Sequence, residues 1–396
     1  FPAYSAEEEA EFVIGRINQW VDQGGRLSEV AILYRSNAQS RLFEQVLLRE
    51  DLPYRVYGGQ RFFERAEIKD AMAYLRLAFN RDDDGAYERI INLPARGLGQ
   101  QTVNKVREHA RASNQSLWSA TGEVLRHDGF SAKATSSLKG FVDIITEIGD
   151  YESLDDAVKA AVELSDLAAW YAKKEAPDRA ESRQENLEEL VRAAGSYQQP
   201  FEDEQAGLSP MASFLAQAAL EAGEHQSDRW EDSVQLMTLH SAKGLEFPLV
   251  FLAGLEEGLF PHQKSVEEAG RLAEERRLCY VGMTRAMQQL YLTHAESRMI
   301  HGQTSFSPPS RFIREIPEHL TEAIRQTHTQ SPAQMWASSA DEQSQFALGS
   351  AVHHARFGFG TVVSLEGQGA NARVQVNFEE AGSKWLVLAY ANLEPA

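Results

Sequence analysis

The sequence predicts an α/β protein whose parallel-sheet core is interrupted by a mostly helical insertion and followed by a small β-barrel. Three observations predict this class. Helical and strand-like segments alternate over residues 1–57 and again over 233–315, a pattern typical of a parallel sheet wrapped by helices. Residues 58–232 carry long helical patterns and no run that reads as a buried central strand. Over residues 347–396, glycine turns separate short strands of alternating polarity.

The first core segment gives a helix, a strand, a second helix and a second strand. The first helix opens near Ser5 with three glutamates, which favour the positive end of its dipole, and it ends at Gly24. Val30–Tyr34 has the length and composition of a buried strand. The next helix runs to about Glu50, and residues 53–57 form another strand.

The helical insertion contains one motif with a possible ligand. Residues 93–106 have the form of a helix-hairpin-helix, with Gly97 and Gly99 in its tight turn. Such a turn exposes backbone N–H groups at a helix N-terminus, which can bind phosphate without reading bases. An ordinary turn between helices is the alternative on this short motif alone. Farther on, the charge-rich residues 175–189 predict a solvated helix face with local ion pairs.

The second core segment holds a polar loop between two apolar runs, residues 234–239 and 249–255. Both runs have the composition of buried strands, and parallel sheets place ligands at strand ends. A helix is expected over residues 274–287 and a strand over 289–293. Residues 316–346, rich in Gln, Ser, Thr, Ala and Glu, predict a mobile linker.

Composition limits the classes of protein. The chain has 396 residues, of which 43% are hydrophobic and 24% charged, without an apolar run that could span a membrane. Its only cysteine, Cys279, excludes a disulfide framework, and we expect a cytoplasmic, nucleoid-associated protein. The net charge of −19 argues against coating nucleic acid, although a short DNA track needs only a few local cations and aromatic side chains.

Two motifs carry a resemblance to a known family. Thr-Leu-His-Ser-Ala-Lys-Gly-Leu-Glu-Phe, residues 238–247, resembles motif V of superfamily-one DNA helicases of the UvrD, PcrA and Rep type. Glu-Glu-Arg-Arg-Leu-Cys-Tyr-Val-Gly-Met-Thr-Arg-Ala, residues 274–286, resembles their motif VI. The resemblance extends over essentially the whole chain. It implies a RecA-like core and an SH3-like or Tudor-like barrel.

The resemblance implies an ATP site around Arg285. In the family, this arginine points at the γ-phosphate, where its planar, permanently charged fork stabilises phosphoryl transfer. Glu246 matches a contact to the ATP ribose, and Gly244 allows a tight turn beside it. A surface ion pair is the alternative role for Arg285 if the motif stood alone.

The resemblance also implies a DNA track. Motif V would place Thr238, His240 and Lys243 at the single strand, where their side chains can donate to phosphate. The remaining positions implied to contact DNA lie elsewhere in the chain: Arg35, Asn37, Arg96, Gly97, Gly99, His262 and His301.

The sequence contains no Gly-Lys phosphate loop and no strand-borne Asp-Glu pair for magnesium. We therefore expect the C-terminal half of a 3′-to-5′ helicase, inactive alone, that uses ATP with Mg²⁺ bound by an N-terminal RecA-like half. Single-stranded and junction DNA are the expected substrates, in repair or replication.

Two alternatives remain. The chain could be a non-catalytic DNA-binding module. It could also dock on RNA polymerase or repair proteins through the barrel, where Trp385 and Phe359 form either an aromatic face or a core.

Overall fold

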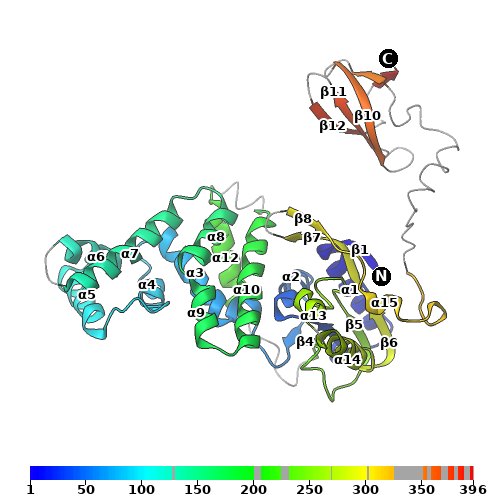
Figure 1. Ribbon diagram of the computed structural model, residues 1–396, viewed down its shortest axis with the longest axis horizontal. Helices are drawn as coiled ribbons and strands as arrows, with labels where there is room; N and C mark the ends of the chain where they lie inside the picture. The colour runs from blue at the N-terminus through cyan, green and yellow to red at the C-terminus, as the bar shows by residue number, and fades with distance from the viewer. Residues whose placement is uncertain are drawn as a thin grey trace. The chain divides into compact units, whose positions relative to one another are not determined.

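The computed structural model divides the chain into two units, Phe1–Gln326 and Thr327–Ala396, and each is considered by itself (Figure 1). The structure describes residues 1–126, 130–199, 207–223, 232–268, 270–300, 303–324, 351–354, 358–366, 373–378, 382–387 and 393–395.

A five-stranded parallel sheet forms the centre of the first unit. Its order is β3-β4-β2-β5-β6, so β2 lies between the two strands that carry the polar loop. The parallel-sheet α/β core predicted from the sequence is therefore confirmed. The strands are β2 (Val30–Tyr34), β3 (Tyr54–Val56), β4 (Val234–Thr238), β5 (Phe247–Leu252) and β6 (Ala286–Leu292).

Helices cover both faces of this sheet because alternate residues of each strand point to opposite sides. Ile32 and Tyr34 pack against helices α1 (Ala6–Asp22) and α2 (Ser40–Arg49). Leu33 packs into a second apolar cluster with α14 (Arg271–Met283) and α15 (Arg311–Arg314). Helix α1 begins as expected, with the hydroxyl of Ser5 accepting from the N–H of Glu8 at 3.2 Å.

A smaller three-stranded sheet was not predicted. It has the order β1-β7-β8, with β1 parallel and β8 antiparallel to β7. Its strands are β1 (Pro2–Ser5), β7 (His294–Ile300) and β8 (Gln303–Phe306).

The described part of residues 58–232 is helical and contains no strand. Its helices share one buried apolar cluster that extends from Phe62 to Ala218. The helices are α3 (Ala66–Phe79), α4 (Asp84–Ile90), α5 (Gln100–Ser113), α6 (Leu117–Arg126), α7 (Ala132–Gly149), α8 (Leu154–Leu164), α9 (Leu167–Lys174), α10 (Pro177–Gly195) and α12 (Pro210–Gly223). Helix α13 (Gln263–Glu267) and the 3₁₀ turns η1 (Leu27–Glu29), η2 (Asn37–Gln39), η3 (Phe62–Glu64) and η4 (Glu318–Leu320) complete the unit.

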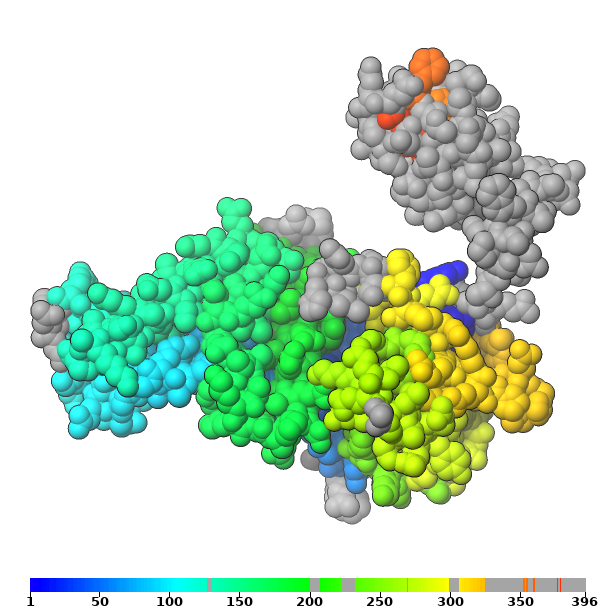
Figure 2. Space-filling view, in the orientation of Figure 1, coloured from blue at the N-terminus to red at the C-terminus, as the bar shows by residue number. Residues whose placement is uncertain are grey.

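Helix α10 packs against the core, so the predicted solvated face with local ion pairs holds only in part: Arg183 pairs locally with Glu175 at 2.7 Å, but other charges of the helix pair with the core. Glu189 accepts from Arg41 at 2.5 Å, and buried Asn186 accepts from Arg65 at 2.9 Å. The green surface of α10 meets the yellow-green surface of the second core segment in Figure 2. Between these two segments, Lys264 pairs with Glu181 of α10 at 2.6 Å. Charged residues of α10 therefore find several of their partners far away in the sequence.

The second unit is an antiparallel sheet of order β12-β11-β10-β9-β13. Four of its strands were predicted, and the last was not. The strands are β9 (Ala351–His354), β10 (Gly358–Glu366), β11 (Arg373–Phe378), β12 (Gly382–Val387) and β13 (Leu393–Pro395). Phe359 is exposed, whereas the side chain of Trp385 and residues 325–346 of the expected linker lie outside the described residues. The five domain boundaries stay predictions.

Candidate functional site

Arg285 lies at the junction between α14 and β6, two residues after the helix ends. The expected helix over residues 274–287 therefore ends early, at Met283. The Arg285 Nη1 donates to the carbonyl of Leu245 at 2.8 Å, and the N–H of Phe247 donates to the carbonyl of Arg285 at 2.9 Å. These two bonds bracket Glu246. The structure thus brings together the arginine and the glutamate that were predicted to hold ATP.

The guanidinium of Arg285 is otherwise held by neighbouring oxygens. Its Nε donates to the carbonyl of Val281 at 3.0 Å, and its Nη2 donates to the hydroxyl of Thr284 at 3.0 Å. Within the described residues, Arg285 has no acidic partner, so its charge is not neutralised by an ion pair. A half-buried, uncompensated guanidinium suits an anionic phosphate better than the surface ion pair that was its alternative role.

The loop between β4 and β5 presents the rest of this motif. It crosses the carboxyl end of β2, because β2 lies between the two strands it joins. Gly244 has φ +87°, a left-handed conformation that favours glycine, and Lys243, Gly244 and Glu246 are exposed. Hydrogen-bond acceptors of Glu246 therefore remain open to a ligand.

The other end of this loop reaches a hollow of about 480 Å³ beneath α10, called here the α10 hollow. It brings together five of the predicted DNA-contacting residues from three separate segments of the chain: Arg35, Asn37, Thr238, His240 and His262. Carboxylates from two helices line the same hollow: Asp178, Glu181 and Glu185 from α10, and Glu274 and Glu275 from α14.

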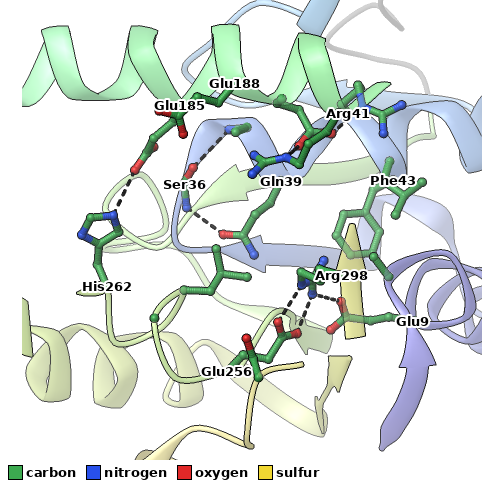
Figure 3. A pocket seen from close by; sticks show the side chains of 18 of the residues that line it. Glu9, Ser36, Gln39, Arg41, Phe43, Glu185, Glu188, Glu256, His262 and Arg298 are labelled. Atoms are coloured by element: carbon green, nitrogen blue, oxygen red, sulfur yellow. Dashed lines mark hydrogen bonds and ion pairs between the residues drawn. The ribbon is translucent and has the colours of Figure 1, made fainter. Parts of the chain in front are cut away.

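Contacts across the α10 hollow hold these polar groups in place. The amide of Asn37 donates to the hydroxyl of Ser182 at 3.3 Å, and the ring of His262 lies 3.5 Å from the carboxylate of Glu185. Figure 3 shows His262 pointing toward Glu185 from the loop below α10. Burial raises the pKa of the Glu185 carboxyl, against the effect of His262 and Arg35.

His240 stands at the edge of the α10 hollow, directly after Thr238 and Leu239. Burial lowers its pKa from 6.5, and the nearby charge of Arg35 lowers it further. His240 is therefore neutral at pH 7, when its imidazole keeps one N–H donor for a phosphate or base.

Three predicted DNA contacts lie away from the α10 hollow, in the turn before α5. Gly97 has φ +73°, and Gly99 is the N-cap of α5, so the predicted hairpin turn is present. The guanidinium of Arg96 is engaged within the helical segment, where it donates to the carbonyl of Ile90 at 2.9 Å. Any phosphate contact here would rely on backbone N–H groups. His301 lies outside the described residues.

The sequence reasoning missed the partners of these residues. Glu275 lies inside the motif VI stretch but was assigned no role. Glu181 and Glu185 were placed on a solvated face, and nothing in their local sequence indicates the contact with the core. A charged residue on a helix reveals its partner only after the chain has folded.

Comparison with known proteins decides the family. Residues 2–297 match the UvrD-like helicase C-terminal domain, and residues 348–394 match the PcrA/UvrD tudor domain. This chain belongs to the UvrD-like helicase family. The predicted family and the Tudor-like C-terminal fold are both confirmed.

Individual relatives of this UvrD-like chain are similar over almost all of its length. DNA helicase II of Escherichia coli K12 is 49% identical over 399 residues, which cover 99% of the chain and 55% of the relative. DNA helicase II of Haemophilus influenzae is 42% identical, over 100% of the chain and 55% of the relative. The ATP-dependent DNA helicase PcrA of Bacillus subtilis is 39% identical, over 98% of the chain and 55% of the relative. The UvrD-like chain thus spans about half the length of these relatives. None of its described helices is long and apolar enough to cross a membrane.

Proposed function

We propose that this chain supplies one wall of the ATP site and part of the single-strand track of a 3′-to-5′ DNA helicase that acts in repair or replication. One observation carries the proposal. A single loop has Thr238 in the α10 hollow at one end and Glu246, bracketed by Arg285, at the other. Names of the relatives, including ATP-dependent DNA helicase PcrA, support the same reaction.

The residues at the α14–β6 junction fit ATP. Glu246 accepts hydrogen bonds from ribose hydroxyls, and Arg285 presents an uncompensated cation to the γ-phosphate. ATP with Mg²⁺ supplies the phosphoryl group, and the magnesium ligands belong to an N-terminal RecA-like half. Arg285 stabilises charge that develops on the transferred group, so this chain alone is predicted to have no measurable ATPase activity.

DNA contacts divide between two regions. Arg35, Asn37, Thr238, His240 and His262 would hold the single strand, with Lys243 and His301 beside them. Duplex DNA at the junction would meet the turn of Gly97 and Gly99. Residues 94–140 around this turn favour a polyanion, because seven cations (Arg96, Lys105, Arg107, Arg111, Arg126, Lys133 and Lys139) outnumber three acids (Glu108, Glu123 and Asp128) in a chain of net charge −19.

The partner half would pack beside β6. This edge strand pairs only with β5 among the described residues and exposes Met287 and Leu290, while Tyr280 of α14 is also exposed. Exposed apolar side chains at a sheet edge are typical of an interface. The assembled helicase would act in the cytoplasm at the nucleoid.

Unwinding by the full-length protein tests this function. We expect ATP-dependent unwinding of a duplex with a 3′ single-stranded tail and little unwinding of the matched duplex with a 5′ tail. DNA binding without ATP hydrolysis would instead identify a non-catalytic DNA-binding module.

The barrel supports a second function, docking on RNA polymerase or on repair proteins. Phe359 on β10 is 59% exposed, and a large exposed aromatic side chain suits a protein interface. A pull-down with the full-length protein and a version ending at Gln345 tests this role. Equal capture by both versions would contradict it.

A further inference from the structure

Glu275 is a buried carboxylate at the centre of the α10 hollow. It lies in the first half of α14 and is 5% exposed. The Nε of Arg35 donates to both of its oxygens at 3.0 Å, and the Nη2 of Arg35 donates at 2.8 Å. Glu275 also accepts from the hydroxyl of Ser265 and from the N–H of His262, each at 3.3 Å. One carboxylate therefore fixes three groups that surround the predicted DNA track.

The pairing leaves one edge of the Arg35 guanidinium available. Glu275 engages Nε and Nη2, and within the described residues Nη1 has no hydrogen-bond partner. Burial lowers the pKa of Arg35, but hydrogen bonding to Glu275 and the negative charges of Glu275, Glu185 and Glu181 together raise it above its ordinary value. Arg35 thus stays charged, with its side edge fixed and Nη1 free to donate to a phosphate oxygen.

The same helix joins Glu275 to the ATP site. Met283, the last residue of α14, follows Glu275 by eight residues, about 12 Å along a helix at 1.5 Å per residue, and Arg285 comes two residues later. Between them, Cys279 and Gly282 are buried, and Gly282 lies directly against the side chain of Leu239. Because α14 is one continuous helix, we expect a displacement of Glu275 to move the α14–β6 junction that carries Arg285 as well.

We propose that Glu275 is a positioning residue that orients Arg35 for the DNA backbone and, through α14, couples this contact to Arg285. This inference rests on the proposed helicase function. An alternative is that Glu275 competes with DNA phosphate for Arg35. Removing a competitor would tighten DNA binding, whereas removing a positioning residue weakens it.

The test uses DNA-stimulated ATP hydrolysis by the full-length protein. Glu275→Ala should raise the DNA concentration for half-maximal stimulation by about tenfold, as expected for a lost charge-assisted hydrogen bond. The KM for ATP without DNA should not change. Glu275→Gln, which keeps an acceptor oxygen, should restore part of the loss. Glu267→Ala on α13, an exposed glutamate, is the matched control and should behave as wild type.

A double-mutant cycle separates positioning from a general structural role. In an Arg35→Ala background, Glu275→Ala should weaken DNA stimulation much less than it does in the wild type, because the contact through Arg35 is already lost and only the bonds to Ser265 and His262 remain to be broken. Additive losses, tighter DNA binding, or an equal loss in the absence of DNA would overturn the inference. A wild-type protein without DNA-stimulated hydrolysis would overturn the helicase function itself, which is a distinct outcome.

Discussion

Arg298 is the buried cation that holds the small sheet on the core. From β7, its Nη2 donates to Glu9 of α1 at 2.6 Å, and its Nε and Nη2 donate to the two oxygens of Glu256 at 2.7 Å. The carboxylates of Glu9 and Glu256 are 2% and 1% exposed. Figure 3 shows Arg298 between them. We predict that Arg298→Met strongly destabilises the first unit.

The expected loss follows from the two carboxylates that remain. In the variant, Glu9 still accepts a hydrogen bond from the N–H of Gly254 at 2.8 Å, and Glu256 still accepts one from the N–H of Ala295 at 2.7 Å. Both carboxylates lose their ion pair with Arg298. Removing one partner of a buried ion pair costs about 3–5 kcal/mol, because an uncompensated charge stays buried. We expect a loss of unfolding free energy in this range at pH 7.

The loss should also depend on pH. Burial raises the pKa of Glu256, and Arg298 opposes this effect. Without Arg298, Glu256 binds a proton more readily in the folded state than in the unfolded state. The stability of the variant therefore falls as the pH rises from the ordinary pKa of a glutamate to the raised pKa of Glu256 in the folded state. The difference between the variant and wild type should therefore be smaller at pH 5 than at pH 7.

Urea unfolding of the 396-residue chain, followed by circular dichroism, measures both effects. Arg277→Met is the matched control, because the Arg277–Glu274 pair is 69% and 70% exposed, and an exposed pair contributes about 1 kcal/mol or less. A loss for Arg298→Met as small as that of the control would refute the reasoning.

Two further predictions concern the packing of α14 and the stability at low pH. Gly282→Ala should destabilise the first unit by about 1–3 kcal/mol in the same urea assay, because its new Cβ would lie 2.4 Å from Cδ2 of fully buried Leu239. Gly15→Ala, in an open position on α1, is the control and should instead stabilise the unit. Equal effects of the two substitutions on the unfolding free energy would contradict this prediction. The unfolding free energy should fall by about 3 kcal/mol between pH 6.5 and pH 4, because burial, and then the amino group of Phe1, lower the pKa of His294 to about 4 and only the unfolded chain takes up the proton. His294→Phe should remove this slope, and an unchanged slope would exclude His294 as its source.

Strands of the central sheet could be predicted because burial on both faces leaves a continuous apolar run. Val30–Tyr34 is buried at every position, and its predicted bounds are those observed. The end of α14 was misplaced because Thr284 and Arg285 carry no glycine or proline signal, and the chain turns from helix to strand within three residues. Local pattern therefore locates an element better than it locates its end.

Polar elements were harder to predict. Strand β7 contains the polar residues His294 and Arg298, so its sequence lacks the alternation of a half-buried strand. The partners of Arg298 come from α1 and from the loop after β5. The family resemblance named five residues that the structure brings together in the α10 hollow, and also Glu246 and Arg285; their roles as ligand contacts stay predictions. The partners of the acidic face of α10 could not be predicted, because they lie far away in the sequence; Lys264 and Glu181, for example, are 83 residues apart.

We propose that Arg285 completes an ATP site shared with another part of the protein. The most direct test of this proposal is the rate of DNA-stimulated ATP hydrolysis by full-length Arg285→Ala, beside Arg277→Met as a control. We predict that Arg285→Ala lowers this rate by about 10³-fold or more, as expected for loss of an arginine finger, while the affinity for single-stranded DNA is unchanged. Hydrolysis by Arg285→Ala at the wild-type rate would contradict the account.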